Sequence, residues 1–312
     1  MLYYYRIFGL LTASEVFLSE AEPAGETDAP DVEVQLGSLN HDITAHPKTK
    51  NPGGVWHYCF PEDGVMWFRA DGIDFQVSGG NRIIIDTHGE DTGLEHLHVF
   101  LLGTAFGTIH MQRGNIPVHG ASVEGRTSAV IITGYSGSGK SAVLGALAME
   151  GIRFLADDVS IVMTENGHPE VYPGYPQRKI ACEDALALGY GVEGLERINE
   201  DGRDKYVVRS AEEWRCEAMP LAAIIELIPA ERTDGEAVTP ELVEVKGHAA
   251  LQLVMRNLYR RQFYSETGLM PEIMKKILVL TSSIRTYRLI RPPEGLTVSE
   301  TAGLIKAGCE EL

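Results

Sequence analysis

The chain has 312 residues, of which 44% are hydrophobic and 23% charged, so it can form one large domain or two ordinary ones with real cores. Its formal net charge of −17 argues against general nucleic-acid binding, which needs an electropositive surface. The scattered cysteines argue against a zinc site, and no signal peptide or bilayer-spanning run is visible, so we expect a cytoplasmic protein without membrane association.

The first part of the chain, residues 1–92, is predicted to form a smaller β-rich domain. Short runs of β-branched and aromatic residues are separated there by turn signals such as Asn51-Pro-Gly-Gly54. The predicted strands are Tyr3–Leu11, Val32–Leu36, Val55–Phe60, Val65–Arg69, Phe75–Val77 and Arg82–Asp86.

The remainder, residues 93–312, is predicted to form an α/β domain. Apolar residues at helical spacing predict a helix at Leu94–Arg113, which would join the two domains. The elements predicted after it are a strand at 128–133, a helix at Ala142–Glu150, a strand at Ile152–Leu155, a hairpin of Val159–Met163 and Glu170–Tyr172, a strand at Leu221–Ile228, a helix at Ala249–Phe263, a strand at Arg285–Ile290 and a C-terminal helix.

Residues 134–141 read Gly-Tyr-Ser-Gly-Ser-Gly-Lys-Ser and match the phosphate-binding loop pattern G-x-x-x-x-G-K-[ST] completely. Glycines let backbone N–H groups approach phosphate oxygens, Lys140 brings a positive charge to them, and the Ser141 hydroxyl can ligate Mg²⁺. The loop lies between a predicted strand and a helix N-terminus, which favours anions. We therefore expect ATP and Mg²⁺ as cofactors. The expected nucleotide-binding residues are Gly134, Ser136, Gly137, Ser138, Gly139, Lys140, Ser141 and Ala142.

A pair of carboxylates, Asp157 and Asp158, follows the short apolar strand at Ile152–Leu155. The carboxyl ends of strands are where ligands bind in open α/β sheets. Adjacent strand residues point to opposite faces, so the two carboxylates are expected to have different roles. One would face the metal and the phosphates, and the other would face the acceptor. A solvated Asp-Asp turn before the hairpin is the alternative.

A histidine, His119, lies in Pro117-Val-His-Gly-Ala121, just before the strand that carries the loop. If its segment pairs with that strand, the imidazole could reach one aspartate and tune its basicity. A lone histidine is more often structural, so spacing alone leaves both readings open.

The order and spacing of His119-Gly120, Gly134–Ser141 and Ala156-Asp157-Asp158-Val159 resemble those of HPr kinase/phosphorylase, in its catalytic domain, and of the looser group of HPr-kinase-like serine kinases. The resemblance covers residues 110–180 by motif and implies a fold like that of phosphoenolpyruvate carboxykinase. It also implies that Asp157 is the catalytic acid/base, that His119 assists it and that Asp158 helps to hold the metal. Lys140, the charged group of the loop, is the third expected catalytic residue. The metal would be held by Ser141 and Asp158.

The stretch Glu170–Arg178 departs from the closely spaced glycines that HPr kinase/phosphorylase carries after its hairpin. Its Pro-Gly-Tyr-Pro form is more similar to HPr-kinase-like proteins of peptide-maturation pathways, one branch of which phosphorylates a serine of a lasso-peptide precursor. The resemblance therefore implies a serine-containing peptide or small protein as substrate, with a lasso-peptide precursor favoured.

Four cations are candidate substrate residues, although each could equally be a solvated surface charge: Arg178, Lys205, Arg256 and Arg260. Arg256 and Arg260 are four apart and would share a helix face. Three other functions stay open: a kinase for free serine or another small molecule, an HPr serine kinase/phosphorylase, and a non-catalytic nucleotide-binding regulator. The oligomeric state is also open, and it includes a homo-oligomer.

Overall fold

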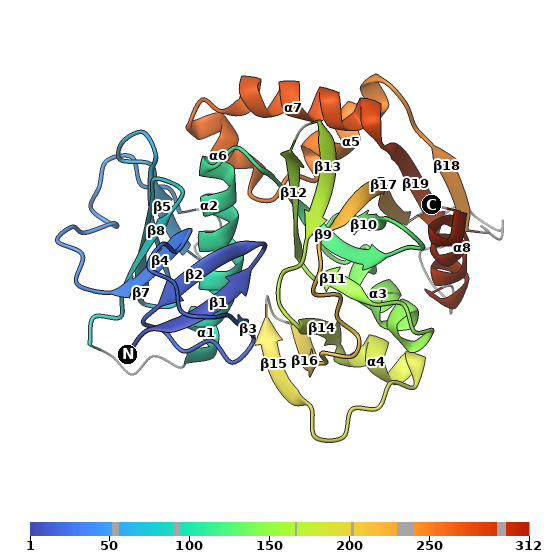
Figure 1. Ribbon diagram of the computed structural model, residues 1–312, viewed down its shortest axis with the longest axis horizontal. Coiled ribbons are helices and arrows are strands. Elements are labelled where there is room, and N and C mark those ends of the chain that lie inside the picture. Colours follow the sequence, from blue (N-terminus) through green and yellow to red (C-terminus); the bar gives the residue numbers. More distant parts are fainter. Residues whose placement is uncertain are drawn as a thin grey trace. The chain divides into compact units, whose positions relative to one another are not determined.

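The computed structural model describes residues 1–51, 56–89, 94–165, 167–200, 203–229, 240–291 and 298–311. It divides into two compact units, Met1–Pro117 with Gln262–Ile273, and Val118–Arg261 with Met274–Leu312 (Figure 1). We predicted the division at residue 92, whereas the structure groups the helical stretch that follows with the first unit. None of the helices in the described ranges is both long and apolar enough to cross a membrane.

The first unit is built on one mixed sheet. Its strands are β1 (Tyr3–Ile7), β2 (Leu10–Ser14), β3 (Glu22–Pro23), β4 (Val32–Leu36), β5 (Trp56–Cys59), β6 (Val65–Ala70), β7 (Ile73–Ser78) and β8 (Arg82–Asp86). Their order in the sheet is β3-β1-β2-β4-β8-β7-β6-β5. The strands predicted at β4 and β8 are confirmed with the same bounds, and those at β5, β6 and β7 are confirmed within a few residues; Val55 lies outside the described residues.

The single strand predicted at Tyr3–Leu11 is wrong, because β1 and β2 form a hairpin there. The two turn residues, Phe8 and Gly9, have φ angles of 48° and 81°. Positive φ at both central residues matches the right-handed twist of the flanking strands. Phe8 is 1% exposed, so burial of its ring holds a conformation that a phenylalanine rarely adopts, and the apolar run concealed the turn.

The helix predicted at Leu94–Arg113 is confirmed in three continuous pieces: α1 (Leu94–Phe100), a π-helical turn (Leu101–Ala105) and α2 (Phe106–Gln112). Side chains fix α2 to the sheet of the first unit. The Thr108 hydroxyl lies 3.3 Å from the Met66 sulfur, and the Gln112 amide donates to the Val77 carbonyl oxygen at 3.4 Å. The apolar spacing predicted the helix, but it did not predict the π-turn within it.

A fully buried histidine, His110, lies on α2 with its ring edge-on to Phe8. Its Nδ1 accepts a hydrogen bond of 3.0 Å from the Asn115 amide, and its Nε2 has no hydrogen-bond partner among the described residues. Burial, with a smaller contribution from Arg113, lowers the pKa of His110 from 6.5 to about 3. The imidazole is therefore neutral in the folded protein at any pH near neutrality.

Replacing His110 by Leu should make the first unit less sensitive to acid. The unfolded chain protonates this imidazole below about pH 6.5 while the folded chain does not, so the stability it contributes is present above 6.5 and is lost as pH falls toward 3. Between about pH 7.5 and pH 5 the wild type should lose about 2 kcal/mol more than the variant. Denaturant unfolding of both proteins at both pH values measures this difference, and parallel losses would contradict it.

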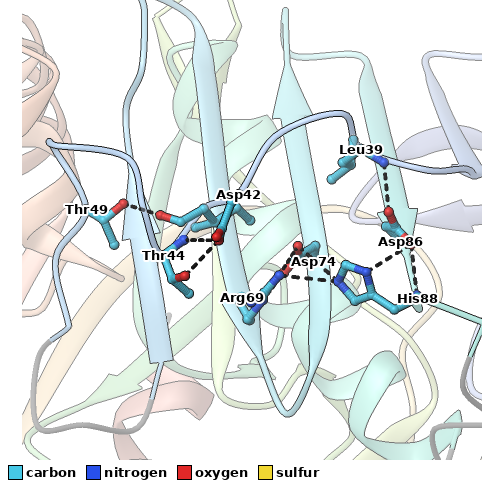
Figure 2. Close-up of polar contacts among 9 residues, drawn as sticks. Leu39, Asp42, Thr44, Thr49, Arg69, Asp74, Asp86 and His88 are labelled. Atoms are coloured by element: carbon cyan, nitrogen blue, oxygen red, sulfur yellow. Dashed lines mark hydrogen bonds and ion pairs between the residues drawn. The ribbon is translucent and has the colours of Figure 1, made fainter.

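A polar cluster crosses β6, β7 and β8 in the first unit (Figure 2). Asp74 is fully buried, and Arg69, directly opposite it on β6, donates to both of its oxygens, with 2.6 Å for Nη2. His88 Nε2 lies 3.1 Å from Asp74 Oδ2, and the backbone N–H of Leu39 donates to Asp86 at 2.8 Å. The cluster compensates a buried charge and ties the segment after β4 to the sheet. Across the described ranges, no group of acidic, histidine and cysteine residues is arranged to hold a metal ion.

The second unit contains another mixed sheet. Its strands are β9 (Ile116–Glu124), β10 (Ala129–Thr133), β11 (Phe154–Ala156), β12 (Val159–Glu165), β13 (His168–Tyr172), β17 (Met219–Pro229), β18 (Glu241–Glu244) and β19 (Arg285–Arg291). The order is β10-β9-β12-β13-β17-β19-β18, with β11 on β9. Because β10 also pairs with β17, in parallel, the pairings close a ring through β10, β9, β12, β13 and β17. The predicted strands and the β12–β13 hairpin are confirmed, except that the strand predicted at Ile152–Leu155 begins two residues later, as β11; the turn residue Asn166 lies outside the described residues.

Two helices, α3 (Lys140–Met149) and α8 (Val298–Glu311), lie side by side against one face of this sheet (Figure 1). Alternate residues of β10, Val130 and Ile132, and of β17, Ile225 and Leu227, belong to the same buried cluster as these helices. Because side chains alternate along a strand, Thr133 of β10 and its neighbour on β17 face the opposite side. All residues of β10 are buried, and the loop that connects it to α3 begins at its carboxyl end.

A third sheet and several helices complete the second unit. The sheet has the order β14-β16-β15, and sequence patterns did not predict it. The elements of the second unit are β14 (Gln177–Ala181), α4 (Cys182–Leu188), β15 (Glu196–Glu200), β16 (Arg203–Arg209), α5 (His248–Arg256) and most of α7 (Met270–Ser283). Most of α6 (Arg261–Glu266) and the start of α7, up to Ile273, belong to the first unit. The helix predicted at Ala249–Phe263 is wrong in extent, because α5 ends at Arg256 and Arg260 has a φ of 49°, which breaks the helix before α6.

Candidate functional site

The phosphate-binding loop predicted at Gly134–Ser141 connects β10 to α3 in the structure. Gly134, Gly137 and Gly139 have φ angles of 145°, 87° and 95°, a region that side chains with a Cβ avoid. At Gly134 a Cβ would lie 2.8 Å from the carbonyl oxygen of Leu227, so two backbones approach too closely for any other residue. Residues 135–137 are exposed and Ser138 is buried, so the loop is anchored at its end and open in its middle.

The charged group of the loop is Lys140, the first residue of α3. Its Nζ donates to the carbonyl oxygens of Gly134 and Tyr135, at 2.7 and 3.1 Å, which holds the ammonium over the loop. Burial lowers the pKa of Lys140, and the charges of Asp158 and then Asp157 act in the opposite direction. The ammonium therefore interacts electrostatically with both carboxylates. Ser141 and Ala142 follow it in the first turn of α3, where backbone N–H groups face an anion.

An arginine that sequence patterns did not single out supports the loop. Arg291, the last residue of β19, donates from Nε to the Ser138 carbonyl oxygen at 2.9 Å. A Cβ at Gly139 would lie 2.9 Å from Nη2 of the same guanidinium, so the glycine leaves room for it. The Ser138 hydroxyl is buried without a hydrogen-bond partner among the described residues. The only signal in the sequence was an arginine at the end of a predicted strand.

Asp157 and Asp158 occupy the turn between β11 and β12, and their environments differ. Asp157 Oδ1 accepts a hydrogen bond from the N–H of Asp158 at 2.9 Å, and its Oδ2 accepts one from the N–H of Lys179 at 2.8 Å. Burial raises the pKa of Asp157, and the bond from Lys179 opposes that rise. The side chain is thus fixed in direction and more basic than an ordinary aspartate.

Asp158 is the more accessible carboxylate, with a side chain that is 55% exposed. Burial acts to raise its pKa, but the charge of His119 and those of nearby lysines outweigh it and hold the pKa of Asp158 below its usual value. Its φ of 65° is rare for a residue other than glycine. Strain of this kind persists only where the surroundings impose it, and it concentrates at functional sites.

His119 lies on β9, which pairs antiparallel with β10, so its segment does neighbour the loop-bearing strand. Its Nδ1 is 3.6 Å from Asp158 Oδ1, whereas we expected it to assist Asp157. Burial lowers the pKa of His119 below its usual value, although the Asp158 carboxylate acts in the opposite direction. At Gly120 a Cβ would lie 2.5 Å from the Ile132 carbonyl oxygen, and the Gly120 N–H donates to the Asp158 carbonyl oxygen at 2.9 Å. A glycine after the histidine is therefore needed to bring β9, β10 and the aspartates together.

The candidate substrate cations fall into two groups. The charge of Lys205, on β16, acts on His119, Lys140 and Asp158, and that of Arg260 acts on His119. Arg178 is buried, and its guanidinium binds Glu213 and Tyr190.

Arg256 forms an ion pair with Glu226, a residue of β17 that is 5% exposed. Since α5 ends at Arg256, the expectation that Arg256 and Arg260 share a helix face is wrong. Of the four cations, Lys205 and Arg260 are thus the two whose charges act on residues of the site.

Comparison with known proteins adds little to this geometry. No family model matches the chain, and no curated protein matches it. Among solved structures, the Hpr(Ser) kinase/phosphatase from Coxiella burnetii is similar over 62% of this chain and 95% of its own, with 13% sequence identity and a TM-score of 0.32. A likeness this weak assigns no activity to the chain. What the site can do is therefore inferred from its own residues.

The residues fit a nucleoside triphosphate with Mg²⁺. The open glycine loop, the lysine held above it and the start of α3 are the parts that bind phosphate oxygens. The Ser141 hydroxyl and the ionised, half-exposed Asp158 carboxylate are hard oxygen donors. Mg²⁺ binds through one or two such protein ligands together with waters and substrate phosphates, so a cage of three carboxylates is not required.

Proposed function

We propose that the protein is an ATP- and Mg²⁺-dependent kinase that phosphorylates a serine hydroxyl of a small peptide or protein. One observation carries the proposal. Two adjacent carboxylates, Asp157 and Asp158, have pKa values shifted in opposite directions, and the Asp158 backbone is hydrogen-bonded to Gly120, which pairs with Thr133 directly before the phosphate-binding loop. Such a divergence separates a base from a group that stays ionised. A protein that only senses nucleotides has no need of the base.

In this mechanism Asp157 accepts the proton of the serine hydroxyl as its oxygen attacks the γ-phosphorus in line. The new bond joins that oxygen to phosphorus, and the bond to the leaving ADP oxygen breaks. Lys140 and the N–H groups of the loop neutralise the charge that develops on the transferred phosphoryl group. His119 holds the Asp158 carboxylate in place. Mg²⁺, held by Ser141 and Asp158, would neutralise phosphate charge when bound.

The acceptor side of the site is proposed to include Lys205 and Arg260, whose charges reach His119. Both are positive on a chain whose net charge is −17, so the site attracts anionic groups against a repelling background. Within the class of serine-containing peptides, a lasso-peptide precursor is the acceptor that the motif resemblance favours.

Intact mass spectrometry tests the proposal. The protein is incubated with ATP, Mg²⁺ and a panel of free serine, serine-containing peptides, lasso-type precursors and HPr, with each peptide or protein paired with a version in which the serine is alanine. We expect a mass gain of one phosphate on a serine peptide and none on its alanine counterpart. Phosphate on free serine alone would show a small-molecule kinase. ATP binding without transfer to any acceptor would show a nucleotide-binding regulator.

A further inference from the structure

Asn257, the residue that follows α5, connects the interior of the sheet to the candidate site. We propose that Asn257, anchored by Glu226, is a positioning residue that fixes His119 against Asp158. The inference rests on the proposed function, because it assigns a role in phosphoryl transfer to two residues that do not themselves reach the reacting atoms.

The anchor is Glu226, on the side of β17 that faces away from α3. It pairs in register with Thr133 of β10 on one side and with Arg288 of β19 on the other. Its side chain is buried, its two oxygens bind the Arg256 guanidinium, and Oε1 also accepts a hydrogen bond of 2.8 Å from the Asn257 amide. These bonds satisfy the carboxylate within the protein. Glu226, which interrupts the apolar run of β17, is therefore a structural anchor.

Asn257 is held through both its side-chain amide nitrogen and its backbone carbonyl. Its amide group donates to Glu226 and also to the Leu253 carbonyl oxygen at 2.8 Å, and the residue is 6% exposed. Its backbone carbonyl oxygen accepts the N–H of His119 at 2.8 Å. The carbonyl oxygen of His119 in turn accepts a hydrogen bond of 2.6 Å from the Thr133 hydroxyl. Both polar groups of the His119 backbone are thus held, one through Asn257 and the other by the strand residue directly beside Glu226.

Asn257 also precedes the residues that cover the ring of His119. Tyr259, two residues after Asn257, stacks on the His119 ring with centroids 6.2 Å apart, and Arg260 adopts a φ of 49° next to it. A change at Asn257 should therefore displace the backbone of His119 and the ring that covers it together. The 3.6 Å contact of His119 with Asp158 depends on both. Small displacements of positioned groups are costly in catalysis, because the reaction needs a narrow range of geometries.

The decisive variant is Asn257→Ala, with Gln252→Ala on the exposed side of the preceding helix α5 as the matched control. Asn257→Ala removes the bonds to Glu226 and Leu253 but keeps the carbonyl that binds His119. We expect kcat to fall about 10- to 100-fold with the KM for ATP unchanged, because the phosphate-binding loop is untouched. The control should match the wild type. A rise in KM for ATP at unchanged kcat would overturn the inference.

A double variant separates positioning from a general loss of structure. If Asn257 acts through His119, adding Asn257→Ala to His119→Ala should cost almost nothing further, since residues of one network are not additive. Fully additive losses would overturn the inference. Glu226→Gln keeps an oxygen that can accept the Asn257 amide and should retain more activity than Glu226→Ala. Equal losses for the two Glu226 variants would also count against it.

A readout that needs no acceptor distinguishes failure of this inference from failure of the proposed function. NMR spectra of histidine-labelled protein show the ring signals, and the signals that disappear in the His119→Gln variant are assigned to His119. These signals should shift in Asn257→Ala and stay in place in Gln252→Ala. The comparison is made under conditions in which denaturant unfolding shows both variants to be fully folded. An unmoved His119 signal in folded Asn257→Ala would overturn the inference even if kinase activity is found. If Asn257→Ala does not fold, Asn257→Ser, which keeps a side-chain hydroxyl, takes its place under the same criteria.

Discussion

Replacing Asp157 by Asn should reduce phosphoryl transfer to the serine acceptor by about 10²- to 10⁴-fold, the contribution expected of a general base. Nucleotide affinity should stay close to that of the wild type. An asparagine keeps an oxygen that can accept the Lys179 N–H, so the turn between β11 and β12 should survive. What disappears is a carboxylate whose pKa is raised by burial, and with it the proton acceptor. Single-turnover transfer and a separate nucleotide-binding titration measure the two effects.

Asp158→Asn is the matched comparison, because it makes the same chemical change one residue away. The Asp158 side chain is half-exposed and lies beside His119. As the proposed metal-side carboxylate, it should alter the Mg²⁺ concentration needed for half-maximal rate, which Asp157→Asn should leave unchanged. If Asp157→Asn retains full transfer while Asp158→Asn abolishes it at every Mg²⁺ concentration, the two roles proposed for the pair are reversed.

The parts of the site that sequence predicted are those encoded over a few consecutive residues. The loop at Gly134–Ser141 has glycines where positive φ and close backbone contact exclude a Cβ, and that requirement is local. The same holds for the buried strand before it, β10, and for the Asp pair after a short apolar strand. The hairpin at Phe8-Gly9 was missed for the opposite reason, because its turn depends on where the Phe8 ring is buried.

The parts that sequence did not predict depend on contacts between distant segments. Arg178 follows a turn and looked accessible, yet it is buried against Glu213, 35 residues away. His119 was expected to assist Asp157, but the positive φ at Asp158 turns that side chain toward the histidine. Asn257 had no signature at all, because its role comes from a carbonyl that meets β9. Residue types within one segment cannot specify which of two neighbouring groups a distant side chain reaches.

Replacing Lys140 by Met should reduce the transfer rate by about 10²- to 10³-fold, the range found when one group that stabilises developing charge is removed. It should also weaken nucleotide binding, which Asp157→Asn should not. Methionine keeps most of the length of the side chain but cannot donate to the Gly134 and Tyr135 carbonyl oxygens that now hold the ammonium over the loop. The rate loss and the affinity loss are read from kcat and from calorimetric titration with nucleotide.

Lys306→Met is the control for Lys140→Met, since it removes one positive charge from the same unit. Lys306 lies on α8 in an exposed ion pair with Glu150. Both variants make the net charge more negative by one, so any effect of bulk charge on an anionic nucleotide is equal in the two. A specific role for Lys140 requires a large loss in its variant and almost none in the control, because exposed ion pairs contribute little. Equal losses of activity in the two variants would show that Lys140 has no specific role. The proposed mechanism, in which the phosphate-binding loop holds the phosphates beside Asp157 and Asp158, would then be wrong.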